Sequence, residues 1–536
     1  MICLYGNFFK EGEKISVNAN SIELPIASKY IPLKSNLTIH WNLNIPTFES
    51  FIANKAESKI SKKKLQKEII LVRNALFGLL GVDLNEDILA SLKPNISFAT
   101  FRNSKDGKDD WILILQTNSN EEAILLGENI RGKRIFKDKG ISENNNKYGN
   151  LNGELIEKYS DKVGGNYSLI NQNFVFITSR YEALNEVLEV SENSKLSQMG
   201  DEKIEGQIRS LNKGFALIIA SPNKINSLLH MPLSSDSITS SPYFISSLMI
   251  ENHDIKIDSV LILNESKTIE ENIEDEVEEV IKVDKKEEFN ANQYDKFEDY
   301  SFDFKKVNII DYAFLNRPSS LLGSGNKSQL AQLSQPIIEM LLKDYDSHFP
   351  EIILKSNEEN IMLIKNKSGW VIIEDSKSHQ NSNFQNIIES MNYVESQLEI
   401  DNKQLTVWSR IVPILDPETI DIEAKVGLIL KENENGLNIW GDSISAINEL
   451  EDKNEEAINK YIDKIKSKSS NIGYQTFLLD QNIAKKLLKN CDPWVFLQSL
   501  SGKSFENLIK GIKIDIGNNE IQGMELINIK TNISIT

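Results

Sequence analysis

Cysteine and histidine are scarce in this sequence, and their positions exclude several kinds of site. The only cysteines among the 536 residues, Cys3 and Cys491, lie at opposite ends of the chain. They form neither a disulfide framework nor a closely spaced pair of metal ligands, so the redox compartment stays undetermined. No two histidines have ligand spacing such as HxxxH or HxH, and we expect no metal site. The histidines, each expected at the surface or at a strand edge, are His40, His230, His253, His348 and His379.

Basic residues and long apolar runs are also under-represented. Lysine and arginine total 60 against 78 acidic residues, which gives a net charge of -18 and a pI near 5.0. This balance argues against a nucleic-acid partner, which would need clustered basic side chains. The first 25 residues contain no apolar run of the roughly 18 to 20 residues that span a bilayer, and no signal-peptide pattern. We expect no transmembrane segment in the chain as given.

Catalytic and cofactor motifs are absent as well. Leu500–Ser504 resembles the end of a phosphate-binding loop, but leucine occupies position 497, where that motif needs glycine. Asp83–Asp87 begins like a calcium loop, but Ile88 and Pro94 replace the required glycine and glutamate, so a helix cap explains it better. There is no GxSxG elbow. We expect a protein that is not an enzyme, with no catalytic residue, no metal and no cofactor, and any cofactor-binding residue remains unknown.

The stretch Pro94–Gln116 has the clearest local pattern in the chain. Ile96–Phe101 and Trp111–Leu115 are apolar runs of strand composition, and the segment between them is rich in Asp, Lys and Gly. Gly107 follows an aspartate and can adopt a positive φ. The pattern predicts a β-hairpin. Similar reasoning predicts other elements in the first half: helix Asn120–Asn129, strand Asn173–Thr178, helix Tyr181–Val190, strand Phe215–Ala220 and two strands within Met249–Leu263.

Four segments of the first half have counterparts about 260 residues later. Trp370 follows Trp111 by 259 residues, and Pro350–Leu354 with Gly369–Ile373 is expected to form a second hairpin. Ordered matches of this kind predict an internal duplication. We therefore expect an α+β fold of two tandem, internally duplicated halves built from antiparallel hairpins and flanking helices, with both tryptophans as core anchors.

The domain organisation follows from this pattern and from a change in composition. Residues 265–288 contain eleven acidic and four basic side chains without glycine or proline, which is typical of a solvated helix or disordered connector. An acidic arm that docks a basic partner is the alternative. The expected boundaries are an irregular extension at 1–34, a first α+β repeat at 35–264, an acidic linker at 265–300 and a second repeat at 301–536.

Several motifs resemble one known family. These are Ser21–Pro25, Lys29–Pro32, Asn36–Trp41, the segment Arg73–Asp83 and Leu92–Ser97, with Ala220–Pro222 and Phe174–Val190 further along. They are similar to the cyanobacterial proteins grouped as domain of unknown function 3352. The resemblance covers most of the chain and implies no active-site residue. It implies an N-terminal membrane anchor, with the large domain on the lumenal or periplasmic side. Because residues 1–20 are too polar to span, we expect such an anchor upstream of Met1; the alternative is that this member has lost it.

The resemblance and the absence of catalytic motifs together lead to one functional expectation. We expect a non-enzymatic, membrane-associated protein that supports the assembly or stability of a thylakoid or plasma-membrane complex, which would be its partner. The alternative is a carrier for an apolar ligand such as a lipid or pigment, because grooves between domains commonly bind ligands. The sequence does not give the partner, the ligand or the oligomeric state.

Overall fold

Antiparallel β-ladders dominate the described part of the chain. The computed structural model describes residues 23–42, 92–137, 147–151, 154–159, 166–221, 243–251, 254–262, 309–323, 328–345, 347–375, 382–400, 403–415, 420–433, 436–450, 474–489, 509–521 and 524–535. The chain divides into two compact units. The first comprises residues 1–262, 484–514 and 526–536, and the second comprises residues 263–483 and 515–525.

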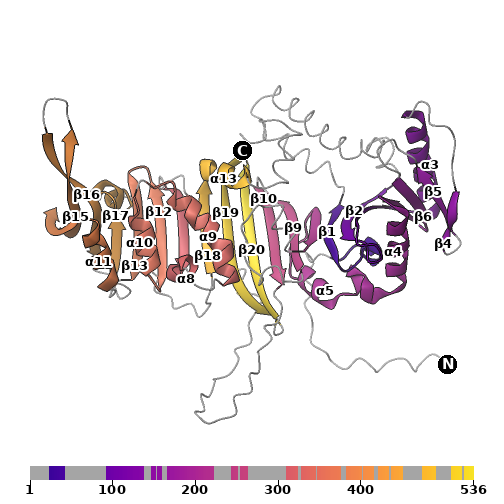
Figure 1. Ribbon diagram of the computed structural model, residues 1–536, viewed down its shortest axis with the longest axis horizontal. Helices are drawn as coiled ribbons and strands as arrows, with labels where there is room; N and C mark the ends of the chain where they lie inside the picture. Colours follow the sequence, from indigo (N-terminus) through magenta and orange to yellow (C-terminus); the bar gives the residue numbers. More distant parts are fainter. Residues whose placement is uncertain are drawn as a thin grey trace, which may run out of the picture. The chain divides into compact units, whose positions relative to one another are not determined.

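The first unit is one continuous antiparallel ladder of strands, shown with its helices in Figure 1. Its strands are β1 (Ser35–Asn42), β2 (Leu92–Arg102), β3 (Asp109–Thr117), β4 (Lys147–Leu151), β5 (Glu154–Tyr159), β6 (Asn166–Asn171), β7 (Phe174–Thr178), β8 (Ala216–Ala220), β9 (Tyr243–Glu251) and β10 (Asp254–Ile262). They pair in the order β10–β9–β8–β1–β2–β3–β7–β6–β5–β4. The C-terminal strand β20 (Met524–Ile535) extends this ladder by pairing with β10.

Two helices cover opposite faces of the strands at the centre of this ladder. Ala123, Leu126 and Ile130 of α3 (Asn120–Lys137) pack against Leu115 of β3 and Val175 of β7. The alternate residues of β3 and β7 face the other way and pack against α4 (Tyr181–Glu192). Because both faces are buried, these strands are apolar without interruption, whereas half-exposed strands alternate. The short helices of this unit are η1 (Ile26–Tyr30), η3 (Ser194–Leu196), η4 (Gln198–Gly200) and α5 (Glu202–Ile208).

The predicted hairpin at 94–116 is confirmed. β2 pairs with β3 from Ile96 opposite Leu115 to Arg102 opposite Asp109, and Gly107 has φ +68° in the turn. Pro94 lies inside β2, where the register is irregular and a missing N–H is tolerated. The predictions of helix 120–129, strand 173–178, helix 181–190 and the paired strands within 249–263 are also confirmed, although the first helix extends to Lys137 and the first of the paired strands begins at Tyr243.

The second unit also consists of antiparallel strands and short helices. Its strands are β11 (Ile309–Asn316), β12 (Asn360–Asn366), β13 (Gly369–Asp375), β14 (Val394–Ile400), β15 (Lys403–Leu415), β16 (Ile420–Asn433), β17 (Leu437–Gly441) and β18 (Tyr474–Asp480). They pair antiparallel in the order β18–β11–β12–β13–β17–β16–β15–β14. The helices in its described part that precede β18 are α8 (Pro318–Leu322), α9 (Gln329–Leu342), α10 (Phe349–Ser356) and α11 (Ser382–Ser390). Helix α13 (Gln481–Lys489) follows β18, and β19 (Ile509–Ile521) pairs with β20.

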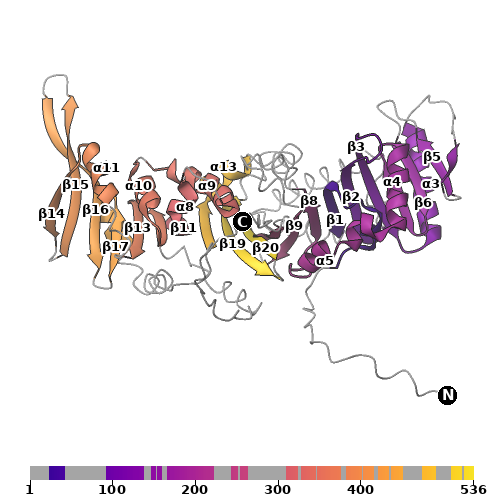
Figure 2. The same cartoon turned by 60° about the horizontal axis from the view of Figure 1, so that its bottom comes forward.

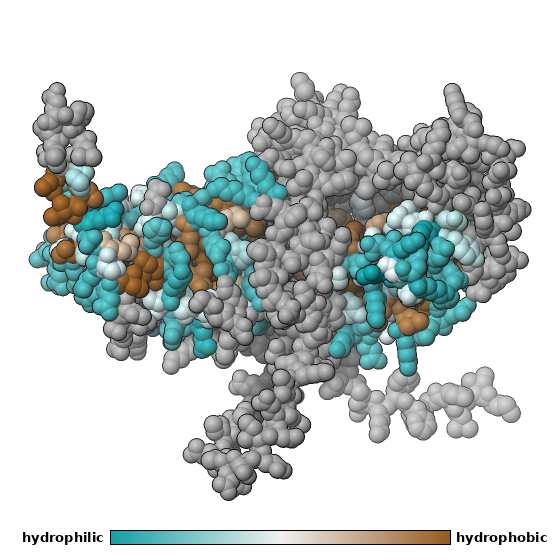
Figure 3. All heavy atoms as spheres, in the orientation of Figure 1, coloured by the Kyte–Doolittle hydropathy of each residue, from teal (hydrophilic) through white to brown (hydrophobic). Residues whose placement is uncertain are grey.

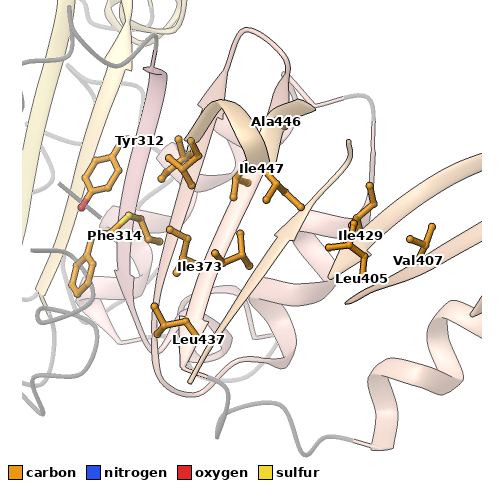
Figure 4. Close-up of a cluster of buried hydrophobic side chains, with 14 residues drawn as sticks. Tyr312, Phe314, Ile373, Leu405, Val407, Ile429, Leu437, Ala446 and Ile447 are labelled. Carbon is orange, nitrogen blue, oxygen red and sulfur yellow. The ribbon is translucent and has the colours of Figure 1, made fainter. Parts of the chain in front are cut away.

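One core of the second unit lies on a single face of its sheet. Alternate residues of β11, β12, β13 and β17 contribute to it, and residues 444–450 supply Ala446, Ile447 and Leu450 (Figure 4). The other face of the same strands carries Trp370 and Trp440, both almost fully buried. Each strand therefore places alternate side chains into separate layers, as the two-residue period of a strand requires.

The predicted fold class is wrong. Antiparallel sheet dominates the described residues, and the compact units are not two consecutive duplicated α+β halves, because the C-terminal strand pairs with β10 in the first unit. In the second hairpin of the expected repeat, strand 369–373 is confirmed within β13, which pairs with β12, but strand 350–354 is wrong. Residues 350–354 lie in helix α10, where Pro350 occupies the first turn and Phe349, Ile353 and Leu354 are buried at helical spacing. Trp370 is buried, whereas Trp111 is half-buried, so the two are not matching core anchors.

Candidate interaction surface

Among the described strands of the second unit, β15 and β16 form the longest hairpin, with 13 and 14 residues. β14 pairs with residues 403–409 of β15, and β17 pairs with residues 429–433 of β16. Beyond these partners, residues 410–415 and 420–425 pair only with each other among the described strands. This end of the hairpin projects past the rest of the sheet (Figure 2). A two-stranded ribbon of this kind is only marginally stable in water by itself.

One face of the projecting ribbon is apolar and exposed. Ile411 lies opposite Ala424 and Pro413 lies opposite Ile422, so these four side chains share a face. Ile411 is 74% exposed and Ile422 is 72% exposed. We call the exposed apolar side chains on this side of the three strands the hairpin face; they are Val394, Leu398, Ile411, Pro413, Ile422, Ala424 and Val426. The apolar colour of the hairpin is visible in Figure 3.

The base of the hairpin is fixed by a bulge and aromatic packing. Trp408 pairs with Leu428, but Ser409 pairs with Val426, which leaves Gly427 as the extra residue. A side chain at Gly427 would overlap the rings of Tyr393 and Phe349, which pack edge to face 5.0 Å apart. The bulge therefore allows close packing beneath the point where the ribbon leaves the sheet. The Arg410 guanidinium lies 5.2 Å from the Tyr393 ring centroid, on the side opposite the hairpin face.

The second feature is a polar network buried on the helix-covered side of the sheet. Glu374 is fully buried and accepts hydrogen bonds from the side chains of Asn357, Asn438 and Trp440. The Trp440 ring stacks on Trp408 at 5.6 Å. The three side chains that donate to Glu374 are neutral. The hydrogen bond from Trp440 fixes the orientation of its ring in the layer beneath α11. We assign this network a structural role, since every contact is closed off from solvent.

A third feature is a row of polar residues across one end of the strands. Asp311 of β11 lies directly opposite Lys365 of β12, which lies opposite Trp370 of β13. Asp311 is 1% exposed; its Oδ1 accepts a hydrogen bond from the Asp480 backbone N–H at 2.7 Å. Its Oδ2 has no hydrogen-bond partner within the described part of the chain. Burial is the main reason that the pKa of Asp311 rises to about 6.

The connection between α9 and α10 covers this row. Lys365 Nζ lies 5.4 Å from the Tyr345 ring centroid and donates a hydrogen bond to the Asp344 carbonyl oxygen at 3.3 Å. Burial, followed by the nearby carboxylates of Asp311, Asp344 and Asp442, raises the pKa of the Tyr345 hydroxyl. Burial also raises the pKa of Asp442. The carboxyl groups in this row can bind and release a proton. Among the described residues, no group of three metal-ligating side chains occurs.

His40 is a buried histidine in the first unit. Its Nε2 lies 3.1 Å from Ser28 Oγ, its Nδ1 lies 2.8 Å from Ser97 Oγ, and desolvation lowers its pKa to about 3. The expectation of a surface or strand-edge position is wrong for His40, which is 3% exposed at the centre of the ladder. Because both serines are also buried, the trio cannot meet a substrate, and it is a satisfied core network.

The remaining sequence candidates are placed as follows. His348 is exposed and precedes α10. Asp83–Asp87, Leu500–Ser504, the acidic residues 265–288 and the other three histidines lie outside the described residues. Sequence reasoning missed the hairpin face, although the alternation of apolar Ile422, Ala424 and Val426 with charged residues was a usable signal. Among the helices that the structure describes, none combines the length and the apolar character needed to cross a membrane.

Comparisons with known proteins give a family and remote structural neighbours. A family model described as "Protein of unknown function (DUF3352)" matches residues 1–293. No curated protein matches the chain. Solved structures of TP0453 in crystal forms III and I are each 11% identical, with TM-scores of 0.26 and 0.23. The match covers 46% of this chain in both cases, and 82% and 81% of those chains. Similarity at this level does not bear on function.

Proposed function

Since the chain belongs to the family described as protein of unknown function (DUF3352), which is assigned no activity, we propose a function from its surface. We propose that the protein is a non-enzymatic, membrane-associated factor that supports assembly or stability of a thylakoid or plasma-membrane complex. The hairpin face is its contact with an apolar surface of that complex. The single observation that carries the proposal is the exposure of Ile411 and Ile422 side by side on a projecting two-stranded ribbon.

The energetics of that ribbon favour a partner. Isoleucine gains about 1.5–3 kcal/mol when its side chain is removed from water, and both of these isoleucines keep most of their area exposed. Contiguous apolar surface on a protein commonly marks an interaction site. Arg410, Glu423 and Lys425 lie on the other side of the same ribbon together with Val412, so that side carries charges whereas the hairpin face carries none. Binding through the apolar face would stabilise the ribbon and leave the charged face in water.

A pull-down from detergent-solubilised membranes tests the proposal. We expect the wild-type chain to recover the subunits of a membrane complex, identified by mass spectrometry. Ile411→Ser with Ile422→Ser should reduce that recovery by about tenfold or more, because two apolar anchors are lost. The matched control is Glu423→Ser with Lys425→Ser, which changes the opposite face of the same strands and should leave recovery unchanged. Recovery of no membrane-complex subunit by the wild type would contradict the proposal.

The carrier alternative stays a prediction from the sequence. It expects a lipid or pigment to accompany the purified protein. Native mass spectrometry of the intact chain checks this directly: a bound small molecule supports a carrier, and a mass equal to that of the polypeptide alone argues against one.

A further inference from the structure

The edge of the second unit's sheet leads to a more specific idea about the partner. β14 pairs with β15 on one side, and the described strands include no partner on its other side. Its residues from Val394 to Glu399 are all exposed, with Val394 at 69% and Leu398 at 43%. In an antiparallel edge strand, alternate residues direct their N–H and C=O groups away from the sheet. β14 therefore offers a template for one more strand.

The two faces of β14 differ in chemistry. Val394 and Leu398 lie on the hairpin face, because Val394 is opposite Ser409 in the row that includes Val426. Glu395 and Glu399 lie on the reverse face, where the residues directly opposite them on β15 are Trp408 and Gln404. Neither carboxylate has a basic residue directly across the strand pair. An added strand would meet apolar side chains on one face and two carboxylates on the other.

A second copy of this chain would bring like charges together in two simple registers at that edge. Two β14 strands paired antiparallel about Gln397 would place Glu395 directly opposite Glu399, and a parallel pair in register would align identical glutamates. Like charges opposite each other destabilise a strand pair. The adjacent edge of β15 is also unsuited to strand addition, because Pro413 has no N–H to donate.

We propose that β14 binds an extended segment of the partner by strand addition, and that this segment alternates basic with apolar residues. The inference rests on the proposed function, because it names how the same partner is held. Main-chain hydrogen bonds to β14 would supply affinity, and pairing of the basic side chains with Glu395 and Glu399 would set register and specificity. The apolar residues of the added strand would extend the hairpin face.

A peptide-binding experiment on the full-length protein tests the inference. The probe is a capped peptide of about eight residues, a common strand length, alternating lysine and valine. Its affinity is measured by fluorescence anisotropy at low salt, and backbone protection is measured by amide hydrogen exchange. We expect the peptide to bind and to slow exchange in residues 394–400. A peptide of the same composition with central prolines, which cannot form a ladder, should not bind.

Charge exchange separates this mode of binding from nonspecific attraction. Glu395→Lys with Glu399→Lys should weaken the lysine–valine peptide at least tenfold, about 1.4 kcal/mol, and should create affinity for a glutamate–valine peptide. Equal binding by both peptides, or protection confined to other strands, would overturn the inference.

The hairpin-face variants distinguish a failure of strand addition at β14 from a failure of the proposed function. Ile411→Ser with Ile422→Ser should leave peptide affinity nearly unchanged, since both residues lie beyond the segment paired with β14. If the wild type recovers a membrane complex but the peptide does not protect β14, strand addition is wrong and the hairpin-face function stands. If the peptide protects β14 but no complex is recovered, the edge binds strands and the proposed function fails.

Discussion

Asp311 illustrates how much the environment of one residue determines its chemistry. In the sequence it is one of 78 acidic residues without a distinguishing motif. In the fold it is buried across from Lys365, next to the Asp480 backbone and under the connection that carries Asp344 and Tyr345. Loss of hydration makes its ionised form costly, and Lys365 compensates only in part. His40 shows the converse in the first unit, where burial keeps an imidazole neutral.

The pKa of Asp311 predicts how stability depends on pH. Because that pKa rises from 3.8 to about 6 in the folded state, the folded state binds the proton more tightly than the unfolded state. This group therefore lowers the free energy of unfolding as pH increases from about 4 to about 6, by about 3 kcal/mol in total. Asp311→Asn should remove this contribution, so the variant gains stability relative to wild type between pH 4 and pH 7.

Hydrogen exchange of β11 and β12 measures this effect within the second unit. That local measurement is needed because His40, whose folded pKa is depressed, makes the first unit lose stability as pH falls from about 6.5 toward about 3. Glu423→Gln, an exposed acid on the ribbon, is the control and should follow the wild-type profile. Identical pH profiles for wild type and Asp311→Asn would refute the assignment.

At the scale of the element, one ionic network joins the first hairpin to the helix that follows β7. Arg180 precedes α4 and donates to Asp110 through Nε at 2.7 Å and Nη2 at 2.6 Å, and to Asp106 through Nη1 at 2.5 Å. The Asp110 side chain is fully buried, and Ser179 Oγ also donates to it at 2.7 Å. The guanidinium therefore connects the β2–β3 turn to the start of α4 in a geometry that a point charge could not reproduce.

Removing this arginine should be far more costly than removing an exposed lysine nearby. Arg180→Ala leaves the buried Asp110 carboxylate without its counter-ion, and we expect a loss of about 3 kcal/mol in the free energy of unfolding. Lys105→Ala breaks the Lys105–Glu189 pair, whose side chains are 53% and 51% exposed, and should cost less than about 1 kcal/mol. Urea denaturation of the two variants compares them, and equal losses would mean that Asp110 finds other compensation.

At the scale of the whole molecule, the C-terminal strand belongs to the unit formed by the start of the chain. Nine consecutive residues of β10, from Asp254 to Ile262, pair with β20 from Ser534 to Leu526. Asn532 Nδ2 also donates to Asp254 Oδ2 at 3.1 Å. Local sequence patterns contain no signal for a contact this distant, and closing such a long loop costs entropy that only the completed ladder offsets.

Deletion of residues 524–536 tests this closure. We expect faster amide exchange in β9 and β10, because Val260, Leu261 and Ile262 lose their neighbours on β20. β12 and β13 of the second unit should retain wild-type protection and act as the internal control. Unchanged exchange in β10 would show that this pairing contributes little to the first unit.

The sequence by itself determined the elements whose signals are local. The hairpin at 96–115 follows from two apolar runs and Gly107, and strand 174–178 with helix 181–190 follows from periodicity, because these patterns depend on neighbours within a few residues. The tertiary structure decided the rest. It placed residues 350–354 in a helix, because Phe349 and Ile353 can be buried together there, and it paired β20 with β10. It also left Ile411 and Ile422 in water while burying Asp311. Burial is a property of the packed chain, so the same residue types acquire opposite roles only once their neighbours are in place.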